Sequence, residues 1–216
     1  IDDFSKVIQI SPKNTEAYLM RAQVRIRVNE LDKALEDFDS VIHLSPEHAK
    51  AWAWKAKLEN QLGKLEEALA DYQKSITLDP MYSWAFNNLS WFYVTCENEK
   101  LRDLKKGLEL AEKAVQMDRK PEYLDTLACA YAESGNFDLA ERLMREAYLR
   151  THSETLKMRC ELFKNRKTYL QWYNEMKVSE YQQELRKQME KEKREQLWQE
   201  IVSQNEAARK KPQAGD

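Results

Sequence analysis

Two stretches of this chain repeat one pattern. Residues 30–46 read ELDKALEDFDSVIHLSP, and residues 64–80 read KLEEALADYQKSITLDP, 34 positions further along. Residue types agree column by column, as in the pairs Ala34 and Ala68, Phe38 and Tyr72, Ile42 and Ile76, and Pro46 and Pro80. The opening residues 1–12, IDDFSKVIQISP, keep the same columns without their beginning. A fixed period of this length indicates an array of stacked structural repeats.

Each repeat is expected to contain two helices. Sixteen residues before the two alanines stand Tyr18 and Trp52, each followed four residues later by another alanine, Ala22 or Ala56. This spacing predicts first helices over 15–28 and 49–62 and second helices over 31–44 and 65–78. Asn29 and Gly63 lie where the turns are expected, and both residue types tolerate a positive φ. Pro46 and Pro80 follow the second helices, which a proline cannot continue.

Two further units follow. The third begins near Ser83, and 21 residues separate its Phe86 from Gly107, where the other units have sixteen between the matching columns. About five extra residues therefore fall near 95–106, either as a longer first helix or as a longer turn. The fourth unit runs from Pro121 to about residue 150.

The repeated columns combine small residues, which let paired helices approach, with large residues that fill the space between units. Together the columns Trp/Tyr, small, Tyr, Gly, Ala, aromatic, Ala and Pro resemble the tetratricopeptide repeat. The resemblance implies an all-α fold, a right-handed α-solenoid of antiparallel helix pairs with a C-terminal capping helix and a long charged helix. Some positions depart from the family pattern: Arg21, Lys55, Arg25, Glu59 and Gly107.

The expected organisation has five parts. Residues 1–12 form the second helix of a truncated repeat, 13–150 four repeats, 151–167 a capping helix, 168–208 a charged helical extension and 209–216 a disordered tail. An array needs a cap because its last repeat otherwise exposes an apolar face. Apolar residues of the extension are spaced by fours and eights, which is only weakly typical of a coiled coil: Tyr181, Leu185, Met189, Leu197 and Ile201.

Composition excludes several classes of protein. Four glycines and five prolines in 216 residues favour helices, and no alternating apolar pattern predicts a strand. A formal net charge of −2 creates no field that would attract nucleic acid, and no apolar run is long enough to span a membrane. Three widely separated cysteines suit a reducing compartment, so a cytoplasmic location is expected. A missing leader says nothing here, because the chain opens inside a repeat.

Neither catalysis nor a cofactor is predicted. The three histidines, His43, His48 and His152, have no partners at metal-ligand spacing. Cys129 stands among small and apolar residues, where packing explains it better than nucleophilic chemistry. Glycine-rich phosphate loops are also missing from the sequence. We therefore expect no enzyme, no metal site and no cofactor.

The resemblance implies that the first helix of each unit lines a concave groove. In the third unit Trp84, Asn87, Asn88 and Trp91 occupy i, i+3, i+4 and i+7, which is one helical face. The candidate partner-binding residues are these four together with Lys50, Trp54 and Lys57 of the second unit and Gln23 of the first. The same alignment places further residues on this face: Leu19, Met20, Arg27, Ala53, Gln61, Glu122, Asp125, Thr126, Cys129 and Glu133. Exposed tryptophans are typical of binding hot spots, and asparagine amides suit a peptide backbone. One alternative is that Trp84 and Trp91 only pack against neighbouring helices. For Lys50 and Lys57 the favoured interpretation is a solvated face without a binding role.

The predicted function is that of a non-catalytic adaptor, which holds a peptide or helix of a partner protein in the groove. A chaperone-type carboxylate clamp is not expected, because Leu19, Gln23, Trp84 and Asn88 stand where that clamp has lysine, arginine and asparagine. An alternative is a scaffold that forms homo-oligomers through residues 1–12 and through Leu197, Trp198 and Ile201. A nucleic-acid partner is not expected from residues 187–196, KQMEKEKREQ, because acidic residues interleave with the basic ones.

Overall fold

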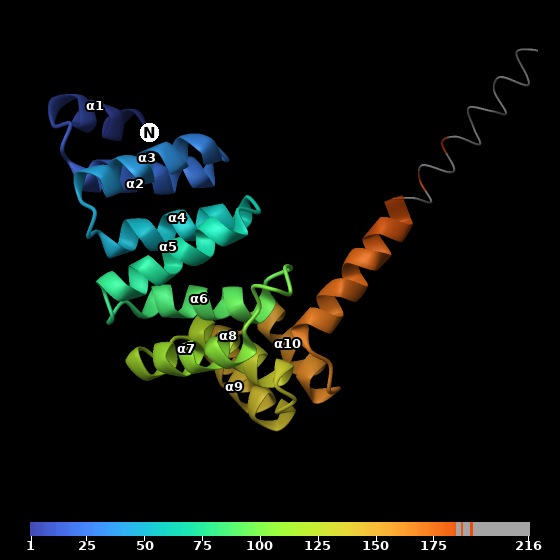
Figure 1. Ribbon diagram of the computed structural model, residues 1–216. Helices are drawn as coiled ribbons and strands as arrows, with labels where there is room; N and C mark the ends of the chain where they lie inside the picture. The colour runs from blue at the N-terminus through green and yellow to red at the C-terminus, as the bar shows by residue number, and fades with distance from the viewer. Residues whose placement is uncertain (185–186, 188–190, 192–216) are drawn as a thin grey trace, which may run out of the picture. The chain divides into compact units, whose positions relative to one another are not determined.

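The computed structural model describes residues 1–184, 187 and 191, and everything it describes outside turns and connectors is α-helix (Figure 1). Ten helices of the described part have these bounds: α1 Asp2–Ile10, α2 Thr15–Arg27, α3 Leu31–Leu44, α4 Ala49–Gln61, α5 Leu65–Leu78, α6 Ser83–Thr95, α7 Leu104–Met117, α8 Pro121–Glu133, α9 Phe137–Thr151 and α10 Glu154–Lys164. One more helix begins at residue 169 and is described to residue 184. The expectation of an all-α fold is confirmed.

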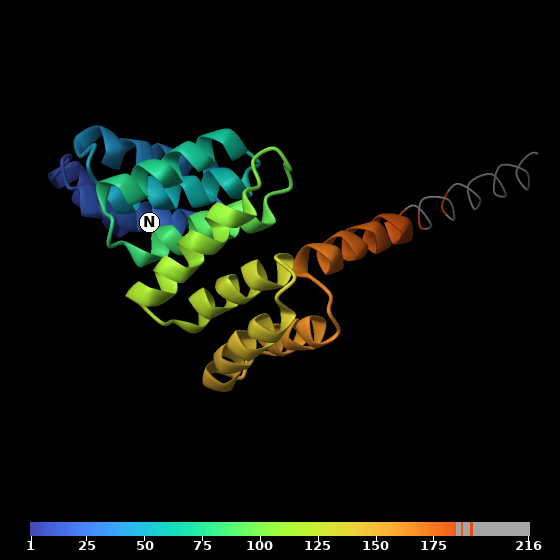
Figure 2. The same ribbon diagram turned by 60° about the horizontal axis from the view of Figure 1, so that its bottom comes forward.

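The helices pair in the order of the sequence. The closest packing joins α2 to α3, α4 to α5, α6 to α7 and α8 to α9, and each pair also contacts the next one. Within a pair the two helices run antiparallel, and successive pairs stack as an α-solenoid (Figures 1 and 2). We call α2, α4, α6 and α8 the first helices and their partners the second helices. Residues 1–169 form one compact unit, and residue 170 begins another.

Turn chemistry explains where the paired helices separate. Asn29, Gly63 and Gly135 occupy the same place between the helices of three units, with φ of 61°, 77° and 84°. Glycine adopts this left-handed conformation without steric cost, and asparagine tolerates it better than most residues. At the start of α2, the Oδ1 atom of Asn14 accepts a hydrogen bond from the backbone N–H of Ala17. These local signals agree with where the helices begin and end.

The third unit accommodates its extra residues in the connector. All four first helices have 13 residues, so α6 is no longer than its counterparts. Residues 96–103 link α6 to α7, and Asp103 donates its backbone N–H to the Tyr93 carbonyl. Of the two alternatives open from the sequence, the longer turn is therefore the one observed.

Gly107 has a packing reason for replacing the alanine of the other units. A Cβ atom at this position would lie 2.7 Å from Cγ2 of Val94, a stiff β-branched side chain. Ser90 donates its hydroxyl to the Gly107 carbonyl at 2.7 Å. The glycine thus allows α6 and α7 to approach more closely than a methyl side chain permits.

The core is built from the repeated columns. Ala34, Ala68 and Ala140 are fully buried between paired helices, and Phe38 and Tyr72 are at most 2% exposed. Buried apolar residues form three clusters along the array, each including residues from neighbouring pairs. Because each cluster draws on adjacent units, no single helix pair contains a complete core.

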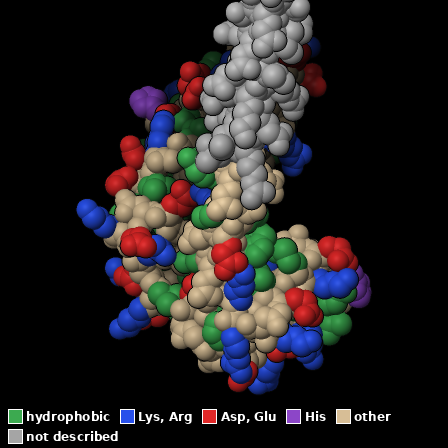
Figure 3. All heavy atoms as spheres, turned by 90° about the vertical axis from the view of Figure 1, so that its right-hand side faces the viewer, with side chains coloured by type: hydrophobic (Ala, Val, Ile, Leu, Met, Phe, Trp, Pro, Cys, Tyr) green, Lys and Arg blue, Asp and Glu red, His purple; other side chains and the backbone are tan. Residues whose placement is uncertain are grey.

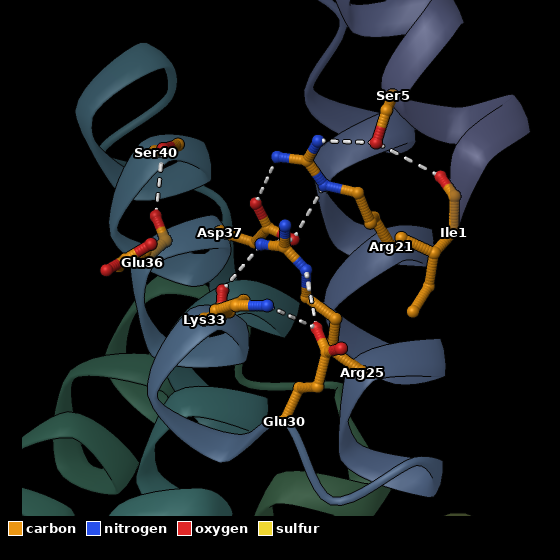
Figure 4. A network of polar contacts seen from close by, with 9 residues as sticks. All are labelled: Ile1, Ser5, Arg21, Arg25, Glu30, Lys33, Glu36, Asp37 and Ser40. Carbon is orange, nitrogen blue, oxygen red and sulfur yellow. Dashed lines mark hydrogen bonds and ion pairs between the residues drawn. The ribbon is translucent and has the colours of Figure 1, made fainter.

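An ion cluster lies between the helices of the first unit (Figure 4). Asp37 of α3 is 2% exposed and accepts two hydrogen bonds from Arg21, at 2.7 and 3.0 Å. A second guanidinium, that of Arg25, approaches the same carboxylate at 2.8 Å, and Arg21 also donates to Ser5 of α1. The departures of Arg21 and Arg25 from the family pattern are therefore compensated by one buried carboxylate.

A second ion cluster surrounds Lys55 of the second unit, and in it carboxylates outnumber cations. Lys55 lies within 3.5 Å of three carboxylates, those of Asp39, Glu59 and Asp71. Glu59 is 5% exposed, and burial together with the charge of Asp71 raises its pKa to about 7. Burial also raises the pKa of Asp71 despite the nearby ammonium. One lysine thus forms ion pairs with three carboxylates in the second unit, whereas two arginines pair with one carboxylate in the first unit.

The predicted charged extension is only partly within the described residues. Of the apolar positions named from the sequence, Tyr181 is exposed, and Leu185, Met189, Leu197, Trp198 and Ile201 lie outside the described residues, as does the predicted tail 209–216. None of the described helices is both long and apolar enough to cross a membrane. The cytoplasmic location stays a prediction.

Candidate partner-binding face

One face of the molecule mixes charges of both signs. On the face drawn in Figure 3, acidic and basic side chains alternate around small hydrophobic patches. A surface of this kind provides no broad electrostatic attraction for one class of partner. Candidate sites must therefore come from local hollows and from the side chains that line them.

One open hollow adjoins the first helices of units 1 and 2. It has a volume of about 650 Å³ and is lined by α2, by α4 with the residues before it, and by the end of α5 with the following connector. Its lining residues are Glu16, Leu19, Met20, Gln23, Glu47, His48, Ala49, Lys50, Trp54, Leu78, Asp79 and Tyr82. We call this site the Trp54 hollow. It brings together Trp54, Lys50 and Gln23 from the residues predicted as partner-binding.

An aromatic stack supports the wall of the Trp54 hollow. The ring centroids of Trp54 and Trp84 are 4.7 Å apart, and Tyr82 stacks on Trp84 at 5.8 Å. The ammonium of Lys57 lies 5.5 Å from the centroids of both tryptophans. Burial raises the pKa of Tyr82 to about 12, so its phenol is neutral at physiological pH. Stacking and the cation hold the half-buried Trp54 in one orientation without covering it completely.

Trp91 has a different environment, which corrects the expectation of an open groove in the third unit. Tyr169 packs against its indole with ring centroids 5.2 Å apart. The Arg159 guanidinium of α10 lies 5.3 Å from the Trp91 ring and 4.8 Å from the Tyr169 ring. We call residues 154–169 the cap segment. Because it follows the last repeat and folds back onto Trp91, the first-helix face is covered by the chain itself at this point.

The same arginine completes an ion pair with the fourth unit. Arg159 pairs with Asp125 of α8, and both side chains are largely buried, at 12% and 16% exposure. Burial raises the pKa of Asp125, while the arginine opposes that shift. Cys129 donates a weak hydrogen bond to the same carboxylate at 3.8 Å. Asp125, predicted on the open face, therefore binds the cap segment.

The two asparagines do not present free amides. Asn87 is only 9% exposed, and its Oδ1 atom is buried without a hydrogen-bond partner among the described residues. Asn88 donates its amide to the Trp84 carbonyl at 2.7 Å, four residues back in the same helix. The hypothesis that both amides hold a peptide backbone is not supported by this arrangement, because one is buried and the other is already bonded to its own helix.

Other predicted groove positions are also less open than expected. Ala53 and Cys129 are fully buried, and Thr126 is 3% exposed, because the first helices pack against their neighbours there. Leu19 is 4% exposed yet contributes to the Trp54 hollow. Helical spacing predicted a shared face, but the curvature of the array decides which part of that face reaches solvent.

Several residues that line the Trp54 hollow or contact Trp91 were missed because they lie outside the first helices. Glu47 belongs to the connector before α4, Asp79 and Tyr82 to the connector before α6, and Arg159 and Tyr169 to the cap segment. The first three could have been suspected, since connectors at the helix ends border the same side. The cap segment lies beyond the last repeat, so the repeating sequence pattern could not predict its contact with Trp91.

The cysteines show no sign of activation. Cys129 is fully buried, and burial raises its pKa well above the ordinary thiol value. Burial likewise raises the pKa of Cys160 to about 11. A thiol without a lowered pKa is a poor nucleophile at neutral pH. These environments suit packing rather than chemistry.

Residues 19–82 match the model of the tetratricopeptide repeat family. This matched stretch, which runs from α2 to the connector before α6, consists of tetratricopeptide repeats. Repeat arrays of this kind are adaptors or scaffolds that bind protein partners, and they are typically non-catalytic. No curated protein sequence matches this chain.

Solved structures with a similar fold include two that are described as tetratricopeptide repeat proteins, TTC0263 and YrrB. TTC0263 from Thermus thermophilus is 19% identical, with 74% of this chain and 86% of that one covered at a TM-score of 0.61. YrrB, described as having an unusual peptide-binding site, is 20% identical, with 74% and 81% covered at 0.59. MamA is 19% identical, with 70% and 86% covered at 0.55. At these identities the likeness establishes the fold alone.

Proposed function

We propose that the protein is an adaptor that holds an extended or helical segment of a partner protein against the first helices of units 1 and 2. The observation that carries the proposal is the Trp54 hollow, an open depression with a tryptophan on its wall. Trp54, Lys50 and Gln23 line it and are its proposed binding residues, whereas Trp84 and Lys57 are proposed to hold the Trp54 ring in place. Asn87, Asn88 and Trp91 are assigned structural roles instead.

The chemistry of the hollow supports a protein ligand. Met20, Leu78 and the indole of Trp54 offer apolar contact, and charged side chains stand around them. Interfaces commonly combine such an apolar centre with a polar rim. The fixed stack of Trp54 on Trp84 also reduces the conformational entropy lost on binding, because the ring is already oriented.

The experiment is a binding screen with the intact chain and an immobilised library of random octapeptides. Trp54→Ala is expected to remove most of the retained peptides while the circular dichroism spectrum stays helical. Trp52→Ala is the matched control, because Trp52 lies two residues away and donates its Nε1–H to the Pro46 carbonyl, outside the hollow. Equal retention by wild type and Trp54→Ala would contradict the proposal.

A further inference from the structure

The cap segment already shows how the first-helix face accepts a ligand group. An arginine side chain, that of Arg159, lies against the Trp91 indole and pairs with the Asp125 carboxylate. Both receiving groups come from first helices, α6 and α8. An indole and a carboxylate on neighbouring first helices thus form a place for a guanidinium in the second half of the array.

The Trp54 hollow has the same two kinds of group without an arginine. Its lining includes three carboxylates, those of Glu16, Glu47 and Asp79, against one lysine, Lys50, and the ammonium of Lys57 lies beside the Trp54 ring. The carboxylates still outnumber the cations. Glu16 and Glu47 are exposed, and within residues 1–184 neither forms an ion pair. Asp79 is less free, because its carboxylate accepts the backbone N–H of Met81. The local charge balance therefore favours a cationic ligand group.

We propose that the Trp54 hollow binds its partner segment through an arginine, whose guanidinium lies beside the Trp54 indole and pairs with Glu16 and Glu47. The inference rests on the proposed function and adds the chemistry of the partner. Arginine suits the site better than lysine because its planar guanidinium stacks on aromatic rings and donates two parallel hydrogen bonds to a carboxylate. An acidic segment is disfavoured by the same carboxylates.

Sublibraries of immobilised octapeptides, each with one fixed central residue, test the inference with the intact chain. Wild type is expected to bind the fixed-arginine sublibrary roughly tenfold more tightly than the fixed-leucine one, and the fixed-aspartate one least. Fixed lysine is expected to lie between arginine and leucine. Raising the salt concentration from about 50 to about 300 mM should reduce the arginine preference, because exposed charges are screened.

Charge reversal supplies the decisive variant. In the doubly substituted Glu16→Lys, Glu47→Lys chain, the arginine preference is expected to disappear while Trp54-dependent retention of apolar peptides persists. Glu67→Lys is the matched control, because Glu67 is an exposed acid of α5 outside the hollow. Both reversed glutamates are exposed, so the fold should be unaffected.

The outcomes separate the two proposals. Trp54-dependent binding without preference for arginine would overturn the inference and leave the adaptor function standing. An arginine preference that survives the double reversal would also overturn it. Loss of Trp54 dependence in every sublibrary would overturn both proposals together.

Discussion

The two halves of the array treat their first-helix faces differently. At units 1 and 2 the Trp54 hollow is open, and ion clusters lie between the paired helices. At units 3 and 4 the cap segment covers Trp91, and apolar residues such as Leu89 and Leu127 occupy the columns of Arg21 and Lys55. One repeat pattern thus supports an open face at one end and a covered face at the other.

The difference teaches that register assigns a face without assigning what packs on that face. Trp54 and Trp91 belong to first helices of the same length and are both half-buried. Their environments separate them, because Trp91 contacts Arg159 and Tyr169 of the cap segment, whereas Trp54 stacks on Trp84 and lines the open hollow. Binding capacity along the array is therefore decided by the cap segment as much as by the repeats themselves.

The largest effect on stability is expected at the ion pair between Arg159 of the cap segment and Asp125. Arg159→Met should lower the free energy of unfolding by about 3 kcal/mol, because it leaves the buried Asp125 carboxylate without its cation. Urea denaturation monitored by circular dichroism measures this loss.

The double variant Asp125→Leu, Arg159→Met is the control for this pair. Replacing both charges removes the unpaired carboxylate, so most of the lost stability should return. A single Arg159→Met variant as stable as wild type would show that the cap segment does not depend on this contact.

Smaller effects on stability are expected for the two tryptophans, and their effects on peptide binding are expected in the reverse order. Trp91→Ala should lower the free energy of unfolding by about 2 kcal/mol, because the ring packs against the core cluster of units 3 and 4 and against the cap segment. Trp54→Ala should lower it by about 1 kcal/mol. Peptide retention should change in the reverse order, with a large loss for Trp54→Ala and little for Trp91→Ala. If Trp91→Ala removed peptide binding without loss of stability, the distinction between open and covered faces would fail.

The last effect depends on pH and concerns the ion cluster of the second unit. Because the folded-state pKa of Glu59 is raised to about 7, the folded chain binds this proton more tightly than the unfolded chain. The stability from the protonated group is fully present below about pH 4.5 and is lost as pH rises through about 7. Relative to Glu59→Gln, wild type should therefore lose about 1 to 2 kcal/mol over this interval.

Urea titrations at about pH 4.5, 6 and 8 measure the Glu59 effect as the difference between the two chains. Glu36→Gln is the control, since Glu36 is an exposed carboxylate of the neighbouring unit. A pH-independent difference between wild type and Glu59→Gln would show that Glu59 titrates at its ordinary pKa in the folded chain.

The fold followed from local patterns that the chain repeats. The paired alanines, the turns at Asn29 and Gly63 and the prolines after the second helices placed the helix pairs closely, because these signals act within a few residues. The candidate site was recovered less fully. Trp54, Lys50 and Gln23 line the hollow, but Asn87 is buried, since burial depends on how neighbouring units lean on one another.

The ion clusters show the same limit. Arg21, Arg25, Lys55 and Glu59 were visible only as departures from a pattern, and their partners Asp37 and Asp71 lie on the second helices. Sequence order does not say that one carboxylate meets two arginines while another shares one lysine. Only the packed pair reveals which charges are satisfied.

By itself, the sequence of this protein determined an array of helix pairs, because helix periodicity, turn residues and the spacing of small and large side chains are local properties that recur every 34 residues. Tertiary structure alone decided which tryptophan stands open, because that depends on Arg159 and Tyr169 returning to the third unit from beyond the repeats. Contacts between residues so far apart in the chain leave no repeating pattern in the sequence. They form only when the stacked units bring these side chains together.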